Sequence, residues 1–108
     1  MTVYNKLVRD RIPEVIENTG KQFSTRILND DEYIIELKKK SFEELNEYVN
    51  AENDKDAIEE LADLLEIIHA LAGYHGASFE EVEKVRQNKA KKRGGFQEKI
   101  FLIEVEDE

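Results

Sequence analysis

The sequence predicts an all-α protein: a helical bundle with two long central helices and a minor strand pair at its edge. Only five of the 108 residues are glycine and one is proline, the two residue types that interrupt helices most strongly. Apolar residues recur at three- and four-residue steps through the middle of the chain, which is the period of one helix face. Residues that cap helices precede each of these segments.

A short helix and a short strand are expected first. Asp10 is the predicted cap of a helix that runs through Asn18, with Pro13 tolerated in its first turn and Gly20 beyond its end. The segment 23–27 alternates apolar and polar residues, which is typical of a strand with one buried face.

The two long helices follow. Polar residues at 29–31 offer caps for a helix that continues to about Val49. After a polar connection, Asp54 or Asp56 is the predicted cap of a second helix, which runs to about Tyr74.

The last part of the chain predicts one more helix and an apolar segment. Ser78 begins this helix, with Glu81 three residues later as a capping box, and the glycine pair at 94–95 ends it. The apolar run at 100–103 predicts a strand or a docking tail. No repeat or long linker divides the sequence, so residues 1–108 are predicted to form a single domain.

The second long helix has an unusually broad apolar surface. Its bundle seam consists of Ile58, Leu61, Leu65, Ile68 and Ala72. Further apolar residues widen this seam, so the helix needs more than one partner, and a chain this short supplies few. The sequence therefore predicts dimerisation.

Composition and charge narrow the possible functions. The formal net charge of −9 argues against binding of nucleic acids or membranes through the whole surface. There is no cysteine, which excludes disulfides and thiolate metal sites. The N-terminus lacks the apolar stretch of a signal peptide, and a cytoplasmic protein is expected.

Two acidic clusters, one on each long helix, are the strongest functional signal. The first contains Glu43, Glu44 and Glu47, and the second contains Glu60 and Asp63. Acids three residues apart share a helix face, so two antiparallel helices bring several carboxylates to one place. Like charges at that distance repel unless protons or cations neutralise them. Oxygen ligands suit Mg²⁺ or Mn²⁺ rather than zinc, so these acids predict a divalent-metal site.

The order and spacing of these motifs resemble those of a known family. The segment E-E-L-N-E at 43–47, followed after twelve residues by E-L-A-D at 60–63, resembles the E-E-x-x-E … E-x-x-D signature of the all-α nucleoside triphosphate pyrophosphohydrolases, the MazG-like superfamily. The segments 4–13 and 92–96 look like the ends of its small, phosphoribosyl-ATP-pyrophosphohydrolase-like house-cleaning members. The resemblance spans nearly the whole chain.

The resemblance implies Mg²⁺-dependent hydrolysis of nucleoside triphosphates between the α- and β-phosphates, giving a nucleoside monophosphate and pyrophosphate. Mn²⁺ is an alternative to Mg²⁺. By the family pattern, Glu44, Glu47, Glu60 and Asp63 would bind the metal. Glu43 would accept a proton from the attacking water.

The resemblance also implies partners for this site. Asn88 and Lys91 match an N-x-x-K element that faces substrate in family members, and Arg93 is a further candidate for phosphate contact. A homodimer or a dimer-based oligomer is implied, with the site near the interface between protomers.

Two other function classes stay open. The chain could be a catalytically silent sensor that binds nucleotide or metal on the same scaffold. It could also be an acidic helical interaction module, since the chain has 25 acidic residues and Lys40 stands four residues before Glu44, at salt-bridge spacing.

Overall fold

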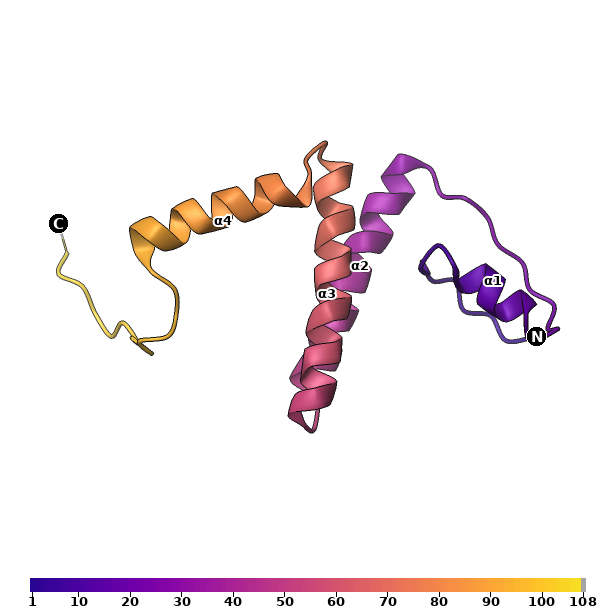
Figure 1. Cartoon of the computed structure of the whole chain (residues 1–108), viewed down its shortest axis with the longest axis horizontal. Coiled ribbons are helices and arrows are strands. Elements are labelled where there is room, and N and C mark those ends of the chain that lie inside the picture. The colour runs from indigo at the N-terminus through magenta and orange to yellow at the C-terminus, as the bar shows by residue number, and fades with distance from the viewer. Residues whose placement is uncertain (108) are drawn as a thin grey trace.

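The computed structural model describes residues 1–107, which form four helices and no strand. The helices are α1 (Ile12–Glu17), α2 (Asp30–Val49), α3 (Asp54–Tyr74) and α4 (Phe79–Arg93). The predicted all-α class is confirmed. Helices α2 and α3 form an antiparallel hairpin, α1 lies to one side of it, and α4 projects from its other side (Figure 1).

The N-terminus of α2 is fixed by a capping box. The Asn29 side chain accepts a hydrogen bond from the backbone N–H of Glu32 at 2.9 Å, and the Glu32 carboxylate accepts one from the Asn29 N–H at 3.3 Å. Arg26 holds the same carboxylate through a further hydrogen bond of 2.8 Å. These contacts satisfy backbone donors that no helical carbonyl can reach.

Replacing this cap is expected to destabilise the protein. Asn29→Ala should lower the free energy of unfolding by about 1 kcal/mol, because α2 loses a side-chain acceptor at its first turn. Chemical denaturation measures the change, with Asn18→Ala, at the end of α1, as the control. An Asn29→Ala variant as stable as the control would contradict this role of the cap.

Two predicted caps were wrong, and two, Asn29 and Ser78, were right. Helix α3 is capped by Asn53, whose side chain accepts from the backbone N–H of Asp56 at 2.9 Å, and not by Asp54 or Asp56. Helix α1 begins after Arg11, which provides no side-chain cap, and not after Asp10. Ser78 caps α4 as predicted, since its side chain accepts a hydrogen bond from the backbone N–H of Glu81 at 3.2 Å, which is one half of the predicted capping box.

The predicted strand pair was also wrong. Neither 23–27 nor 100–103 is a strand, and the structure contains no strand within residues 1–107. A strand needs a partner for its backbone N–H and C=O groups. The two segments lie at opposite ends of the molecule, so they cannot pair with each other (Figure 1).

The hydrophobic core of a single chain is small. In the described part of the chain, the buried apolar residues are Leu37, Ile67 and Ala72, at 3%, 7% and 7% exposure. Only one end of the predicted α3 seam is covered, because Ile58 and Leu61 are 66% and 47% exposed. The chain measures 62 × 35 × 26 Å, and none of its described helices has the length and apolar character needed to cross a membrane.

Candidate metal centre

Three carboxylates from the α2–α3 hairpin meet at one point. Glu44 and Glu47 stand one helical turn apart on α2, and Glu60 approaches from α3. Each offers an oxygen atom, and these three atoms lie within 4.8 Å of one another. We call these three residues the acidic cluster. Because the helices run antiparallel, residues thirteen apart across the connecting turn can face each other.

Two oxygen atoms of the acidic cluster are buried without a hydrogen-bond partner. Glu44 is only 9% exposed, and neither its Oε2 atom nor the Oε2 atom of Glu60 accepts a hydrogen bond. Burying a carboxylate without a donor or a cation is costly. Convergent carboxylate oxygens of this kind are the donor set that hard divalent cations prefer. The acidic cluster could therefore hold a metal ion.

The electrostatics of the cluster favour uptake of positive charge. The pKa of Glu44 is raised to about 7, first of all by burial of its carboxylate. The hydrogen bond and the negative charge of Glu47 raise it further, and so does the negative charge of Asp63. Burial and Glu47 also raise the pKa of Glu60. The nearby ammonium group of Lys40 acts in the opposite direction on the pKa of Glu44. Either a proton or a cation relieves this repulsion.

The raised pKa predicts that the metal-free protein loses stability as the pH rises from about 4.5 to about 7. Glutamate in the unfolded chain releases its proton near pH 4.5, whereas Glu44 in the folded chain holds it to about pH 7. The folded state therefore binds more protons in this window, and raising the pH favours unfolding. Glu32 and Glu83, whose pKa values are lowered by Arg26 and Arg86, titrate below this window.

Chemical denaturation in a chelator at pH 5 and pH 8 measures this effect. We expect the ionisation of Glu44 to lower the free energy of unfolding by roughly 1–3 kcal/mol between pH 5 and pH 8. The Glu44→Gln variant should lose less stability than the native chain over the same interval. Equal pH dependence of the two proteins would contradict the assigned environment of Glu44.

Asp63 lies beside the acidic cluster but has a partner of its own. Its charge is close enough to raise the pKa values of Glu44 and Glu60. Its Oδ1 atom accepts a hydrogen bond of 2.7 Å from Nη2 of Arg9. The acidic cluster therefore contains three of the four predicted metal ligands. The fourth, Asp63, lies next to the cluster in an ion pair with Arg9.

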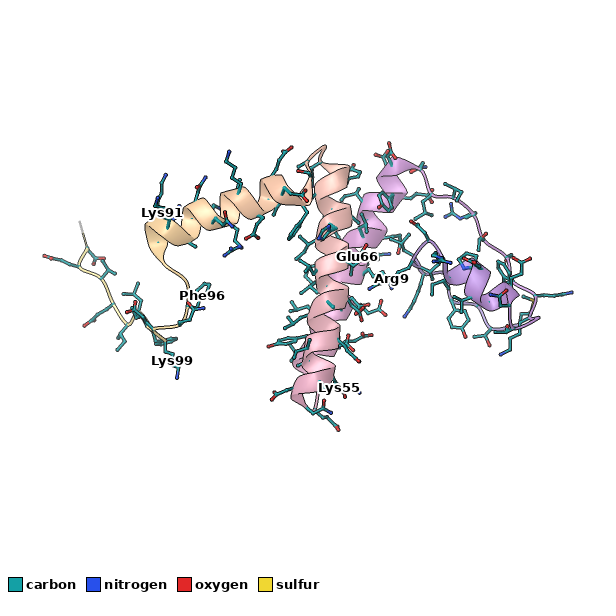
Figure 2. All side chains as sticks on the ribbon, in the orientation of Figure 1. Arg9, Lys55, Glu66, Lys91, Phe96 and Lys99 are labelled. Atoms are coloured by element: carbon teal, nitrogen blue, oxygen red, sulfur yellow. The ribbon has the colours of Figure 1, made fainter. Side chains whose placement is uncertain are left out.

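Glu43, the predicted proton acceptor, is held by the N-terminal segment. Its Oε1 atom accepts a hydrogen bond of 3.2 Å from Nζ of Lys6. Lys6 and Arg9 thus connect the N-terminal segment to α2 and α3 respectively, and Figure 2 shows Arg9 beside the middle of α3. Both pairs are partly solvent-exposed, with side-chain exposures from 38% to 57%, and such pairs contribute little to stability. These cations can therefore change partners at low cost.

The predicted phosphate-binding residues are not close to the acidic cluster within one chain. Asn88, Lys91 and Arg93 are exposed on α4. Figure 2 shows Lys91 near the far end of α4, well separated from Glu66 on α3. The cations that pair with acids beside the cluster are Lys6, with Glu43, and Arg9, with Asp63. The sequence contained only a weak signal for them, a group of basic residues near the start of an acidic chain.

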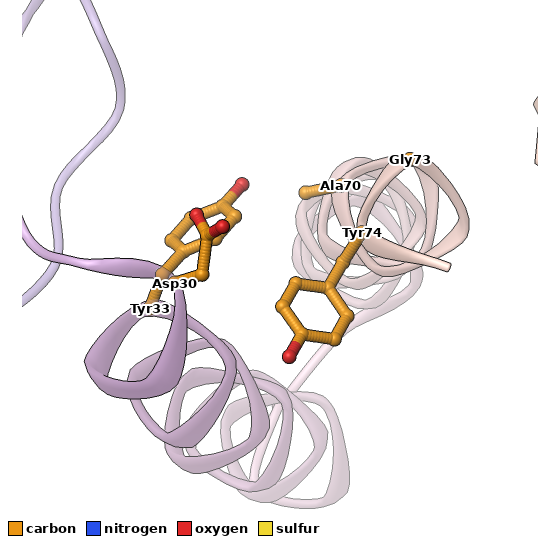
Figure 3. A pocket seen from close by; sticks show the side chains of 5 residues that line it. All are labelled: Asp30, Tyr33, Ala70, Gly73 and Tyr74. Carbon is orange, nitrogen blue, oxygen red and sulfur yellow. The ribbon is translucent and has the colours of Figure 1, made fainter. Parts of the chain in front are cut away.

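Two open cavities in the described part of the chain lie beside the hairpin. One of about 650 Å³ lies at the open end of the hairpin and is lined by Asp30, Tyr33, Ala70, Gly73 and Tyr74 (Figure 3). It is distant from the acidic cluster, because Tyr33 and Glu44 are eleven residues apart, about 16 Å along the helix axis. The second, of about 240 Å³, lies between the N-terminal segment and α2 and includes Lys6 and Glu43 in its lining.

Comparison of the chain with protein-family models, with curated proteins and with solved structures gave no significant match. The resemblance to the MazG-like superfamily therefore stays a prediction from the motifs.

Proposed function

We propose that this chain is a Mg²⁺-dependent nucleotide pyrophosphohydrolase that cleaves nucleoside triphosphates between the α- and β-phosphates. The observation that carries the proposal is the buried carboxylate of Glu44, whose Oε2 atom has no hydrogen-bond partner and which offers an oxygen within 4.8 Å of oxygens from Glu47 and Glu60. The acidic cluster has only carboxylate donors, which favours Mg²⁺ or Mn²⁺ over softer metals. The order of the acids along the sequence supports the same assignment.

The proposed chemistry divides among the residues of the hairpin. Glu44, Glu47 and Glu60 would hold the metal ion, which would supply neutralisation of phosphate charge and activation of water. Asp63 adds a carboxylate at the edge of this group. Glu43, next to Glu44 in the sequence and paired with Lys6, would accept the proton of the water from the edge of the site.

Two cations of the N-terminal segment fit a triphosphate that docks at the cluster. Lys6 and Arg9 hold Glu43 and Asp63 in exposed ion pairs. A triphosphate carries more negative charge than either carboxylate, and the guanidinium group of Arg9 can donate two hydrogen bonds to phosphate oxygens. We therefore add Lys6 and Arg9 to the proposed phosphate-binding residues Asn88, Lys91 and Arg93.

A second copy of the chain belongs to the same proposal. The exposed α3 seam and the small core of one protomer support a homodimer or a dimer-based oligomer. The partners proposed for this protein are thus a nucleoside triphosphate and another copy of itself.

One assay separates the proposed enzyme from the two other function classes. The protein is incubated with Mg²⁺ and a panel of canonical and damaged nucleoside triphosphates, and the release of pyrophosphate and nucleoside monophosphate is measured. We expect release that requires the metal and stops in a chelator. Tight nucleotide binding without turnover would indicate a sensor instead. Neither nucleotide binding nor any response to metal would indicate an interaction module.

A further inference from the structure

A single chain exposes far more surface than a compact protein of its size. Its accessible surface is 10187 Å² for a mass of 12.6 kDa. A compact monomer of that mass exposes roughly 6,200 Å², about 4,000 Å² less. The radius of gyration of 18.7 Å is also large beside the roughly 13 Å expected for this length. Obligate homodimer interfaces bury about 2,000–5,000 Å² or more, counted over both partners. Two such chains together carry an excess of about 8,000 Å², which is more than enough surface for an interface of this class.

Much of the excess lies in an arm that leaves the hairpin. We define the arm as α4 together with residues 94–105. Helix α4 carries the chain away from α3, and Phe96 and Lys99 lie far from the hairpin (Figure 2). The apolar residues of the arm after α4 are exposed by 71% to 95%: Phe96, Ile100, Phe101, Leu102, Ile103 and Val105. Six large apolar side chains within ten residues do not stay in water when an apolar surface is available.

The hairpin offers such a surface. On α3, Ile58, Leu61 and Leu65 are 66%, 47% and 44% exposed and stand at helical spacing. On α2, Phe42 and Val49 are 73% and 68% exposed. We call these five residues the receiving face, and within residues 1–107 each of them stays at least 44% exposed.

The charges of the two surfaces are complementary. Residues 30–74, which include both hairpin helices, contain fourteen acidic and four basic side chains. Helix α4 contains six basic and three acidic side chains, with Lys91, Lys92 and Arg93 in its last turn. Surfaces of opposite charge attract each other and fix the orientation of docking.

The junction between α3 and α4 directs the arm away from its own hairpin. The His69 ring stacks on the Phe79 ring with centroids 4.0 Å apart, which fixes the start of α4 against α3. From there the fifteen residues of α4 carry the chain about 22 Å outward before the apolar segment begins. This direction leaves the apolar end of the arm open to a neighbouring molecule.

We infer that the arm of each chain packs along the α2–α3 hairpin of a second copy, so that two chains exchange arms in a symmetric dimer. Such an exchange is isologous, because each copy supplies both an arm and a receiving face. The inference does not depend on the proposed hydrolysis. If both hold, the exchange also brings the cations of α4 near the acids of the other copy, where one chain alone does not place them.

Disulfide trapping tests the exchange directly, because the native chain contains no cysteine. Leu61→Cys is introduced into a tagged, heavier chain and Phe101→Cys into an untagged chain. The two are mixed and oxidised, and the products are separated by mass. We expect a heavy–light disulfide dimer in higher yield than with Glu59→Cys, which lies on another face of α3 and serves as the matched control.

A double variant that carries both cysteines in one chain tests whether the arm instead packs on its own hairpin. An intramolecular disulfide in the double variant, with no heavy–light product in the mixture, would show that the arm folds back on its own hairpin. That result would overturn the inference.

The mass of the native chain in solution gives an independent measurement. Sedimentation equilibrium at micromolar concentration should give twice 12.6 kDa. A chain truncated after Gly95 should show a dimer dissociation constant raised by about 100-fold or more, since it loses six apolar anchors. A monomeric native chain, or a truncated chain that dimerises as tightly as the native one, would contradict the exchange. Neither measurement involves nucleotide, so failure here and failure of the proposed activity are distinguishable.

Discussion

Glu47→Gln is expected to lower Mg²⁺-dependent release of pyrophosphate by at least about 100-fold. The Glu47 carboxylate contributes to the raised pKa values of both Glu44 and Glu60, so it lies between the two helices of the acidic cluster. Glutamine keeps the shape of the side chain but removes its negative charge. The cluster then has one charged donor fewer for the metal that the proposed reaction requires.

Glu47 is well suited to this experiment because its side chain is exposed, so the substitution leaves the core intact. Glu59→Gln is the matched control: it removes an exposed carboxylate of α3 that does not belong to the acidic cluster. Circular dichroism and sedimentation should show the same fold and mass for both variants. Full activity in Glu47→Gln, or an equal loss in Glu59→Gln, would contradict the assigned site.

Addition of Mg²⁺ or Mn²⁺ at pH 8 should stabilise the native protein strongly. A metal ion at 100 times its dissociation constant adds about 2.7 kcal/mol to the free energy of unfolding when it binds only the folded state. For a chain of this size, that corresponds to a rise in Tm of roughly 10–20 °C. The stabilisation arises because the cation neutralises the convergent carboxylates of Glu44, Glu47 and Glu60.

Addition of metal should reverse which of the two proteins, the Glu44→Gln variant or the native chain, is the more stable. Without metal at pH 8 the variant should be more stable than the native chain, because it lacks the buried charge of Glu44. With metal it should be the less stable of the two, because it binds the ion weakly. Differential scanning calorimetry in chelator and in metal gives all four values. A native protein whose Tm does not respond to either metal would contradict this prediction.

The helices could be predicted from the sequence because their signals are local. The apolar spacing and the capping residues near Asn29 and Ser78 lie within a few residues of the helix ends that they determine. The cap of α3 was predicted at Asp54 or Asp56 and lies at Asn53 instead, because all three side chains can accept the required hydrogen bond. The strands were predicted wrongly because alternation shows only that a segment can pair, and not that a partner lies within reach.

The acidic cluster could also be predicted, because acids one helical turn apart on the two antiparallel helices of a hairpin can face each other. The ion pair between Arg9 and Asp63 could not, because it joins residues 54 apart and depends on the path of the N-terminal segment. The direction of α4 was not predictable either. It follows from the junction at Gly76, with φ of +76°, and from the stacking of His69 on Phe79, and neither has a signature in the spacing of apolar residues.

The most direct test of the metal centre is the anomalous scattering of Mn²⁺ in crystals grown or soaked with that ion. The acidic cluster predicts a peak between the carboxylate oxygens of Glu44, Glu47 and Glu60. Crystals that bind Mn²⁺ elsewhere on the protein but show no peak between these three side chains would contradict the account.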